Sequence, residues 1–154
     1  MKTLAVVPGK CRACQRCVLY CSFSHNKTHA PSKARIYVVR RDVNGRVINT
    51  PVICLQCGLC MNACPVPGAM RRNKAGAVVV DEEKCTGCGL CVMSCPYGVI
   101  QIDATTGKAF KCDLCDGSPV CVEHCPFGAL VYVELEKAAQ LRRMSTATVV
   151  VRHE

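Results

Sequence analysis

Sixteen cysteines, arranged in four groups of four, constrain this 154-residue chain more than any other feature. The third group is Cys85, Cys88, Cys91 and Cys95, followed directly by Pro96, with the spacing C-x2-C-x2-C-x3-C-P. The first three cysteines can converge from one tight loop, and the fourth begins a short helix that points away from it. This spacing is typical of chains that wrap a 4Fe-4S cluster and whose fourth thiolate ligates a second cluster. One such run therefore predicts a partner run elsewhere in the chain.

The other three groups repeat the pattern with small differences. Group one is followed by Ser22 instead of proline, which predicts a longer helix after its fourth cysteine, to about Ser24. Group four has a longer loop between its second and third cysteines. In chain order, the groups are Cys11, Cys14, Cys17 and Cys21; Cys54, Cys57, Cys60 and Cys64; Cys85, Cys88, Cys91 and Cys95; and Cys112, Cys115, Cys121 and Cys125.

Three kinds of chemistry could use so many cysteines: disulfides, zinc sites and iron–sulfur clusters. Disulfide frameworks are typical of secreted chains, and the apolar stretch 4–7 is too short for a signal peptide. A structural zinc site is usually closed by two C-x2-C pairs, whereas three groups here have three evenly spaced cysteines and a fourth. The pattern favours 4Fe-4S clusters, and zinc stays the alternative metal.

Composition and charge support bound clusters and exclude several other classes. The hydrophobic fraction of 50% includes the cysteines, so the ordinary apolar core is thin and metal binding must contribute folding energy. The formal charge is +9, but four oxidised clusters with their thiolates contribute about −8, which leaves roughly +1. We therefore expect no nucleic-acid partner; a nucleic-acid-associated Fe-S or zinc protein is the remote alternative. No apolar run approaches the roughly 18 residues of a membrane span, and we expect a cytoplasmic chain.

Short strands and helices are predicted between the cysteine groups. The β-branched runs 34–41 and 47–53 flank Asn44-Gly45, which predicts a hairpin. The residues 134–144 have helical composition. The other predicted elements are a strand at 4–7, a basic turn at 71–74, short strands at 77–80, 98–102 and 127–133, and a β-prone segment at 146–152.

Groups two and three share one layout of cysteine loop, short helix, Cys-Pro and strand, repeated after about thirty residues. This is the pseudo-twofold layout of a bacterial-type ferredoxin, and groups one and four are expected to form a second module around it. The predicted fold is α+β: two nested 2×(4Fe-4S) ferredoxin modules with short helices and small antiparallel sheets. The predicted boundaries are 1–133 for the tetra-cluster domain, with 1–50 and 108–133 as the outer module and 51–107 as the inner, and 134–154 for a C-terminal extension.

Exchange of the fourth cysteine between paired groups predicts the ligands of four clusters. Cluster 1 is expected on Cys11, Cys14, Cys17 and Cys125; cluster 2 on Cys112, Cys115, Cys121 and Cys21; cluster 3 on Cys54, Cys57, Cys60 and Cys95; and cluster 4 on Cys85, Cys88, Cys91 and Cys64. Backbone N–H groups around Gly58, Gly87 and Gly89 are expected to donate to cluster sulfurs.

Charged and titratable residues near the cysteines have two interpretations each. The flanking cations either favour the reduced clusters or are ordinary solvated charges: Lys10, Arg12, Arg16, Lys84 and Lys111. His25 and His29 are predicted to be surface-loop residues rather than metal ligands. His124, between two cysteines of group four, is expected to be a hydrogen-bonding or surface residue. No phosphate-binding loop, Rossmann fingerprint or nucleophile–base pair is visible, so no catalytic residue is predicted.

With its nested modules and widened last group, the segment 3–133 resembles the four-cluster electron-transfer subunits of molybdenum and tungsten bis-pterin oxidoreductases. Residues 21–25, the strand 34–40 and the compact group four are most similar to the iron–sulfur subunit of tungsten aldehyde oxidoreductases. The resemblance implies a non-catalytic subunit that carries electrons between a catalytic molybdenum or tungsten subunit and another redox subunit or acceptor. A flavin-containing subunit is a further candidate partner.

Alternative functions share the same cofactors. The chain could be a free-standing polyferredoxin carrier, or the electron-transfer subunit of a hydrogenase, formate dehydrogenase or carbon-monoxide dehydrogenase. The extension 134–154 either packs on its own domain or is an assembly element. In the second case, the edge of a strand at 148–151 would pair with a catalytic subunit or with a second copy of the chain.

Overall fold

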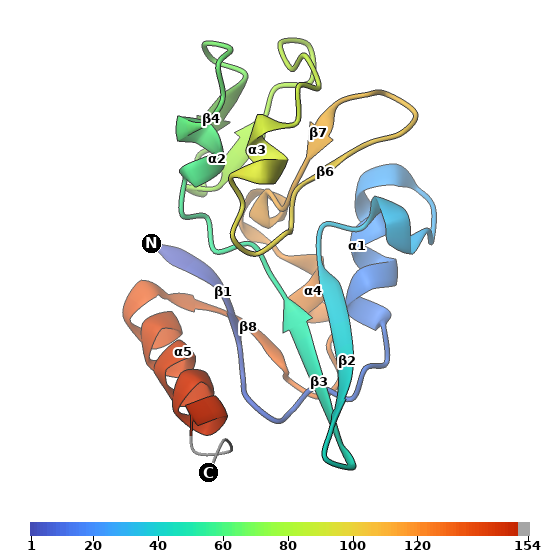
Figure 1. Ribbon diagram of the computed structural model, residues 1–154, viewed down its shortest axis with the longest axis vertical. Coiled ribbons are helices and arrows are strands. Elements are labelled where there is room, and N and C mark those ends of the chain that lie inside the picture. The colour runs from blue at the N-terminus through green and yellow to red at the C-terminus, as the bar shows by residue number, and fades with distance from the viewer. Residues whose placement is uncertain (151–154) are drawn as a thin grey trace.

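Four two-stranded antiparallel sheets and a set of mostly short helices form the α+β structure of this chain (Figure 1). The computed structural model describes residues 1–150, the last five by their backbone alone. The strands are β1 (Lys2–Val6), β2 (Tyr37–Val43), β3 (Arg46–Val52), β4 (Met70–Arg72), β5 (Val78–Val80), β6 (Gln101–Ile102), β7 (Ala109–Phe110) and β8 (Leu130–Glu134). The helices are α1 (Arg16–Asn26), α2 (Leu59–Asn62), α3 (Leu90–Met93), α4 (Val120–Glu123) and α5 (Leu135–Val150), with 3-10 turns η1 (Pro31–Lys33) and η2 (Leu114–Gly117).

Residues from both ends of the sequence form one sheet. Strand β1 pairs with β8, with Lys2 opposite Glu134 and Val6 opposite Leu130. Helix α1, which follows the first cysteine loop, packs against α4 of the last cysteine group. The buried side chains of Leu4, Val18, Leu114 and Leu130 form a common core with several cysteines, so the first and fourth groups share one hydrophobic centre.

The middle of the chain forms a second centre, which lies above the first in the orientation of Figure 1. Strand β4 pairs with β5, β6 pairs with β7, and the short helices α2 and α3 pack against each other. Met70, Val78, Ile100 and Ala109 are buried there, together with Cys60 and Cys91. The second and third cysteine groups therefore share their own core.

The predicted hairpin is confirmed. Strands β2 and β3 pair in register from Tyr37 opposite Val52 to Val43 opposite Arg46. Asn44 and Gly45 at the turn have φ of 52° and 74°. Positive φ at both central residues is the geometry of a type I′ turn, which Asn-Gly favours because its twist matches that of the flanking strands.

Two local predictions are wrong. The basic segment predicted as a turn at 71–74 begins as strand β4, because Met70–Arg72 pair with Val78–Val80. The β-prone segment predicted at 146–152 is helical as far as Val150, where α5 ends; residues 151 and 152 lie outside the described part. β-branched residues lower helix propensity by well under 1 kcal/mol each, so a helix already begun can continue through them.

The helix α5 packs on its own domain. Ala138 and Leu141 are buried against Ala5 of β1, with Val131 and Val133 of β8 beside them. Since residues 148–150 are helical, the expected edge pairing by a strand at 148–151 is not available to them. Among residues 1–150, no helix is long and apolar enough to cross a membrane.

Candidate metal centres

Cysteines line four cavities of the described structure, four of them in each of three cavities and five in the other. Their empty volumes are nearly equal, 310 to 330 Å³. Each contains three cysteines of one group and the fourth cysteine of the partner group, as in the sets assigned above to single clusters. Cavity 1 is lined by Cys11, Cys14, Cys17 and Cys125; cavity 2 by Cys112, Cys115, Cys121 and Cys21, with Cys54 in addition; cavity 3 by Cys54, Cys57, Cys60 and Cys95; and cavity 4 by Cys85, Cys88, Cys91 and Cys64.

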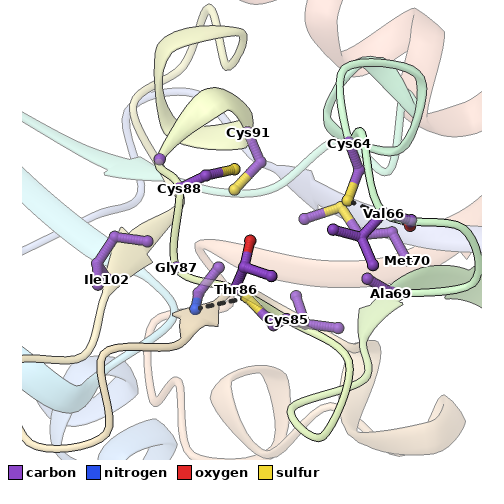
Figure 2. Close-up of a pocket in the computed structure, with 13 residues that line it drawn as sticks. Cys64, Val66, Ala69, Met70, Cys85, Thr86, Gly87, Cys88, Cys91 and Ile102 are labelled. Carbon is purple, nitrogen blue, oxygen red and sulfur yellow. Dashed lines mark hydrogen bonds between the residues drawn. The ribbon is translucent and has the colours of Figure 1, made fainter.

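Cavity 4 shows how two segments supply one set of thiols. Figure 2 shows the side chains of Cys85, Cys88, Cys91 and Cys64 around a common space. Cys85 and Cys88 lie on the loop before α3, Cys91 lies within α3, and Cys64 follows α2. Apolar side chains complete the lining: Val66, Ala69, Met70, Val80, Ile102 and Ala109. Four thiols in a mostly apolar cavity are the donor set of a 4Fe-4S cluster.

One backbone geometry recurs in all four cysteine loops. The residues directly before and after the second cysteine have positive φ, from 52° to 88°: Ala13 and Gln15, Gln56 and Gly58, Gly87 and Gly89, and Leu114 and Asp116. This conformation costs residues other than glycine roughly 1–2 kcal/mol each. Strain of this kind persists where surrounding structure or a ligand over-determines the backbone, typically at functional sites. The glycines signalled it in two loops; Ala13, Gln15 and Leu114 carry no such signal in the sequence.

Backbone N–H groups donate to four of the cysteine sulfurs. The amide of Arg35 lies 3.3 Å from Cys21 Sγ and that of Ala109 lies 3.4 Å from Cys85 Sγ. The amides of Ala129 and Ala13 lie 3.3 and 3.5 Å from Cys125 Sγ and Cys11 Sγ. Hydrogen bonds to a ligating sulfur orient it and stabilise its negative charge. These donors are additional to the amides expected around Gly58, Gly87 and Gly89, and they come partly from remote segments.

Burial makes the free thiols hard to ionise. It raises the pKa of Cys17 to about 11 and that of Cys112 to about 12, and it also raises the pKa of Cys121. Thiols with such values are protonated at neutral pH unless a nearby cation stabilises the thiolate. Cluster iron supplies that cation, so cluster binding must release protons and contribute to folding.

His25 is a site residue that the sequence interpretation placed wrongly in a surface loop. It lies in the last turn of α1 and lines cavity 2, with a side chain only 12% exposed. Its Nε2 is 3.1 Å from Asp113 Oδ1, and its Nδ1 is 3.9 Å from Cys21 Sγ. The Asp113 carboxylate raises the pKa of His25 to about 12. Arg35 Nη1 donates to the same carboxylate at 2.6 Å.

The other two histidines within residues 1–150 lie away from these contacts. The ring of His29 is exposed and stacks on Phe23 at 4.7 Å, and the ring of His124 stacks on Tyr20 at 3.6 Å. Of the five flanking cations, four are exposed and Lys111 is 2% exposed. Lys111 is therefore the buried one of these five cations.

The cavities follow one another in numerical order. Helices α1 and α4 pack together, and Cys17 of cavity 1 and Cys121 of cavity 2 are buried in the same core. Cys54 lines both cavity 2 and cavity 3. Helices α2 and α3 bring Cys60 of cavity 3 to Cys91 of cavity 4. Cys14, Cys57 and Cys88 are exposed, whereas the cysteines assigned to cavity 2 are buried or half-buried.

Comparison with known protein families identifies iron–sulfur domains in this chain. Residues 46–135 match the family model of a 4Fe-4S dicluster domain, and residues 8–24 match that of a 4Fe-4S binding domain. No curated protein matches the chain significantly.

Among solved structures, a chain of the "Active site complex BamBC of Benzoyl Coenzyme A reductase in complex with Benzoyl-CoA" is 25% identical, with a TM-score of 0.48 and coverage of 99% of this chain and 96% of that chain. A chain of the same complex with 1,5 Dienoyl-CoA is 24% identical, with a TM-score of 0.49 and coverage of 99% and 95%.

Proposed function

Because this chain belongs to the family of 4Fe-4S dicluster domains, we propose that it carries four 4Fe-4S clusters and serves as the electron-transfer subunit of an oxidoreductase complex. The observation that carries the proposal is that each of four cavities of similar size is lined by three cysteines of one group and the fourth cysteine of the partner group. The proposed ligands are the cysteines named for each cavity, with Cys54 assigned to cavity 3.

A 4Fe-4S cluster, when bound, supplies reversible one-electron transfer. The residues of this chain hold the thiolates, donate N–H groups to the sulfurs and exclude water with apolar side chains. Contact between successive cavities, through Cys54 in one case, supports passage of electrons from one end of the series to the other. No residue of the chain is assigned a bond-making role in this proposal.

The proposed partner is the catalytic subunit of a molybdenum or tungsten enzyme, in the first place a tungsten aldehyde oxidoreductase, with a flavin-containing subunit or another acceptor at the opposite end. The resemblance of residues 3–133 to such electron-transfer subunits supports it. Cys14 and Cys88 are exposed at the first and last cavities, as Cys57 is at cavity 3, and the first and last cavities are the two ends of the series. These two ends are therefore the proposed sites of electron entry and exit.

Anoxic purification from the native host tests the proposal. We expect about sixteen irons and as many sulfides per chain, and co-purification with a subunit that contains molybdenum or tungsten. Zinc in place of iron, or far fewer irons, would contradict the cluster assignment. Purification alone with full iron would favour a free-standing polyferredoxin carrier.

The exchanged pairing is tested by single cysteine replacements. Cys21→Ser is expected to perturb the same electron paramagnetic resonance signal as Cys115→Ser, because both residues line cavity 2. Cys14→Ser, from the same group as Cys21 but in cavity 1, is the matched comparison. If Cys21→Ser and Cys14→Ser perturb one common signal, the exchange of fourth cysteines is excluded.

A further inference from the structure

Lys111 is a buried cation at the junction between cavity 2 and cavity 3. It directly precedes Cys112 of cavity 2, its side chain lines cavity 3, and it is 2% exposed. We propose that Lys111 is a positioning residue for electron transfer: its fixed ammonium charge raises the reduction potential of the cluster held by Cys54, Cys57, Cys60 and Cys95. This inference rests on the proposed function, because it requires a cluster in cavity 3.

Hydrogen bonds hold the Lys111 side chain in one place. Its Nζ donates to Gln56 Oε1 at 3.1 Å, to the Cys112 carbonyl at 2.8 Å and to the Val78 carbonyl. An ammonium has three N–H donors, and each has an acceptor here. Gln56 is itself 5% exposed, accepts from the amide of Val78 and donates to the Cys112 carbonyl. The charge is therefore fixed in position by elements of both cysteine centres.

Two other groups also have a lysine at this sequence position, but its side chain is exposed there. Lys10 and Lys84 directly precede the first cysteines of groups one and three, as Lys111 precedes that of group four. Lys10 is exposed, and the Lys84 side chain is 55% exposed and lies 3.7 Å from Asp81. Water and salt screen the charges of such residues, whereas a buried charge acts through a lower dielectric. The three lysines share one position relative to the cysteines, but we expect only the buried Lys111 to act strongly on a cluster.

The Lys111 charge has no carboxylate partner among the ion pairs of the described residues. A buried ammonium without a compensating negative charge is costly. A 4Fe-4S cluster with four thiolates carries about −2 when oxidised, which would supply the missing charge.

The effect on the cluster follows from the charges involved. One electron from an adjacent 4Fe-4S cluster takes the cluster and its ligands from about −2 to about −3, with no proton uptake, and the donor cluster is oxidised by one electron. A fixed positive charge stabilises the more negative state. Lys111 should therefore make the cluster of cavity 3 easier to reduce, so that electrons reach it readily at the junction between the two centres.

The experiment is a mediated redox titration of the anoxically purified protein, followed by electron paramagnetic resonance. In Lys111→Met we expect the equilibrium constant for reduction of one cluster to fall at least tenfold, which equals about 59 mV for one electron. The affected signal should be the one that Cys57→Ser perturbs. Lys111→Gln removes the same charge but keeps an amide that can donate to the neighbouring carbonyl groups, and it should lower the same potential; it decides the matter if Lys111→Met does not retain its clusters.

Lys84→Met and Lys10→Met are the matched controls and should leave all potentials within a twofold change in the reduction constant. Unchanged potentials in Lys111→Met or in Lys111→Gln, with full iron content, would overturn the role of Lys111 and leave the proposed function intact. An equal fall in the two controls would also overturn it, because exposed charges would then act as strongly. Absence of iron from the wild-type protein would contradict the proposed function itself.

Discussion

The residues beside the second cysteine of each loop adopt a left-handed backbone. Two of these positions, Gly87 and Gly89, would tolerate a side chain to different degrees. Gly87 and Gly89 both have positive φ, 72° and 80°. A Cβ on Gly87 would lie 2.1 Å from the carbonyl oxygen of Gly107, whereas a Cβ on Gly89 would meet nothing within 4 Å. A side chain at Gly89 would therefore meet only conformational strain, whereas a side chain at Gly87 would also overlap the backbone of Gly107.

Gly87→Ala is expected to be much more harmful than Gly89→Ala. Both substitutions carry the left-handed penalty of about 1–2 kcal/mol, and only the first adds a steric overlap, which costs about 1–3 kcal/mol more. Thermal unfolding of the cluster-loaded proteins under anoxic conditions measures the difference. Equal melting temperatures would show that the turn 103–108 moves away at no cost.

At this scale the sequence predicted which residues supply sulfur, but not how the residues around them are buried. The cysteine spacing implies its own loop geometry, because the first three cysteines of each group are close together in the sequence. Lys10, Lys84 and Lys111 are equivalent in the sequence, and their burial differs because Gln56 and β5 cover only Lys111. His25 was misplaced for the same reason, since Asp113, its partner, comes from a remote segment.

Among the elements, α5 illustrates how tertiary contacts decide a weak local preference. The hairpin β2–β3 was predictable because Asn44-Gly45 fixes the turn locally. The β-branched residues near the C-terminal end of α5 indicated a strand, yet the helix continues to Val150. Its buried face rests on β1 and β8, which no local pattern reveals. The Asn-Gly signal at 44–45 was thus reliable, and local propensity at 146–150 was not.

Leu141 is expected to hold α5 on the sheet. The side chain is 9% exposed, and Leu141→Ala should lower the free energy of unfolding by about 2 kcal/mol. Leu135→Ala makes the same chemical change where the side chain is 45% exposed and should cost under about 0.5 kcal/mol. Denaturant unfolding of the cluster-loaded proteins measures both values. A similar loss in the two variants would mean that the packing of α5 does not stabilise the domain.

In the whole molecule, an ion pair joins the two cysteine centres at a point away from the cavities. Lys33 of η1, before the hairpin, lies 2.6 Å from Asp103 in the turn between β6 and β7. The Lys33 ammonium lowers the pKa of Asp103 to about 2, from an ordinary value of 3.8. The pair is therefore intact in the folded protein at all moderately acidic and neutral pH values.

The stabilisation that the Lys33–Asp103 ion pair provides depends on pH. Because the pKa of Asp103 is lowered in the folded state, the stabilisation is complete above the ordinary value of 3.8 and is lost as the pH falls toward 2. Lys33→Met should lose its clusters faster than the wild type by a constant ratio between about pH 8 and 5, and the ratio should shrink below about pH 4. Anoxic absorbance decay measures it. Asp103→Asn should give the same profile, and a ratio that varies between pH 8 and 5 would refute this account.

The pairing of β1 with β8 has a consequence for biosynthesis. Cavities 3 and 4 take all their cysteines from residues 54–95, so these thiols are all synthesised before group four is translated. Cavities 1 and 2 each combine cysteines of residues 11–21 with cysteines of residues 112–125. The earliest-made thiols must therefore wait longest for their partners, and during that interval the nascent chain is most vulnerable to oxidants and stray metals at its N-terminal segment.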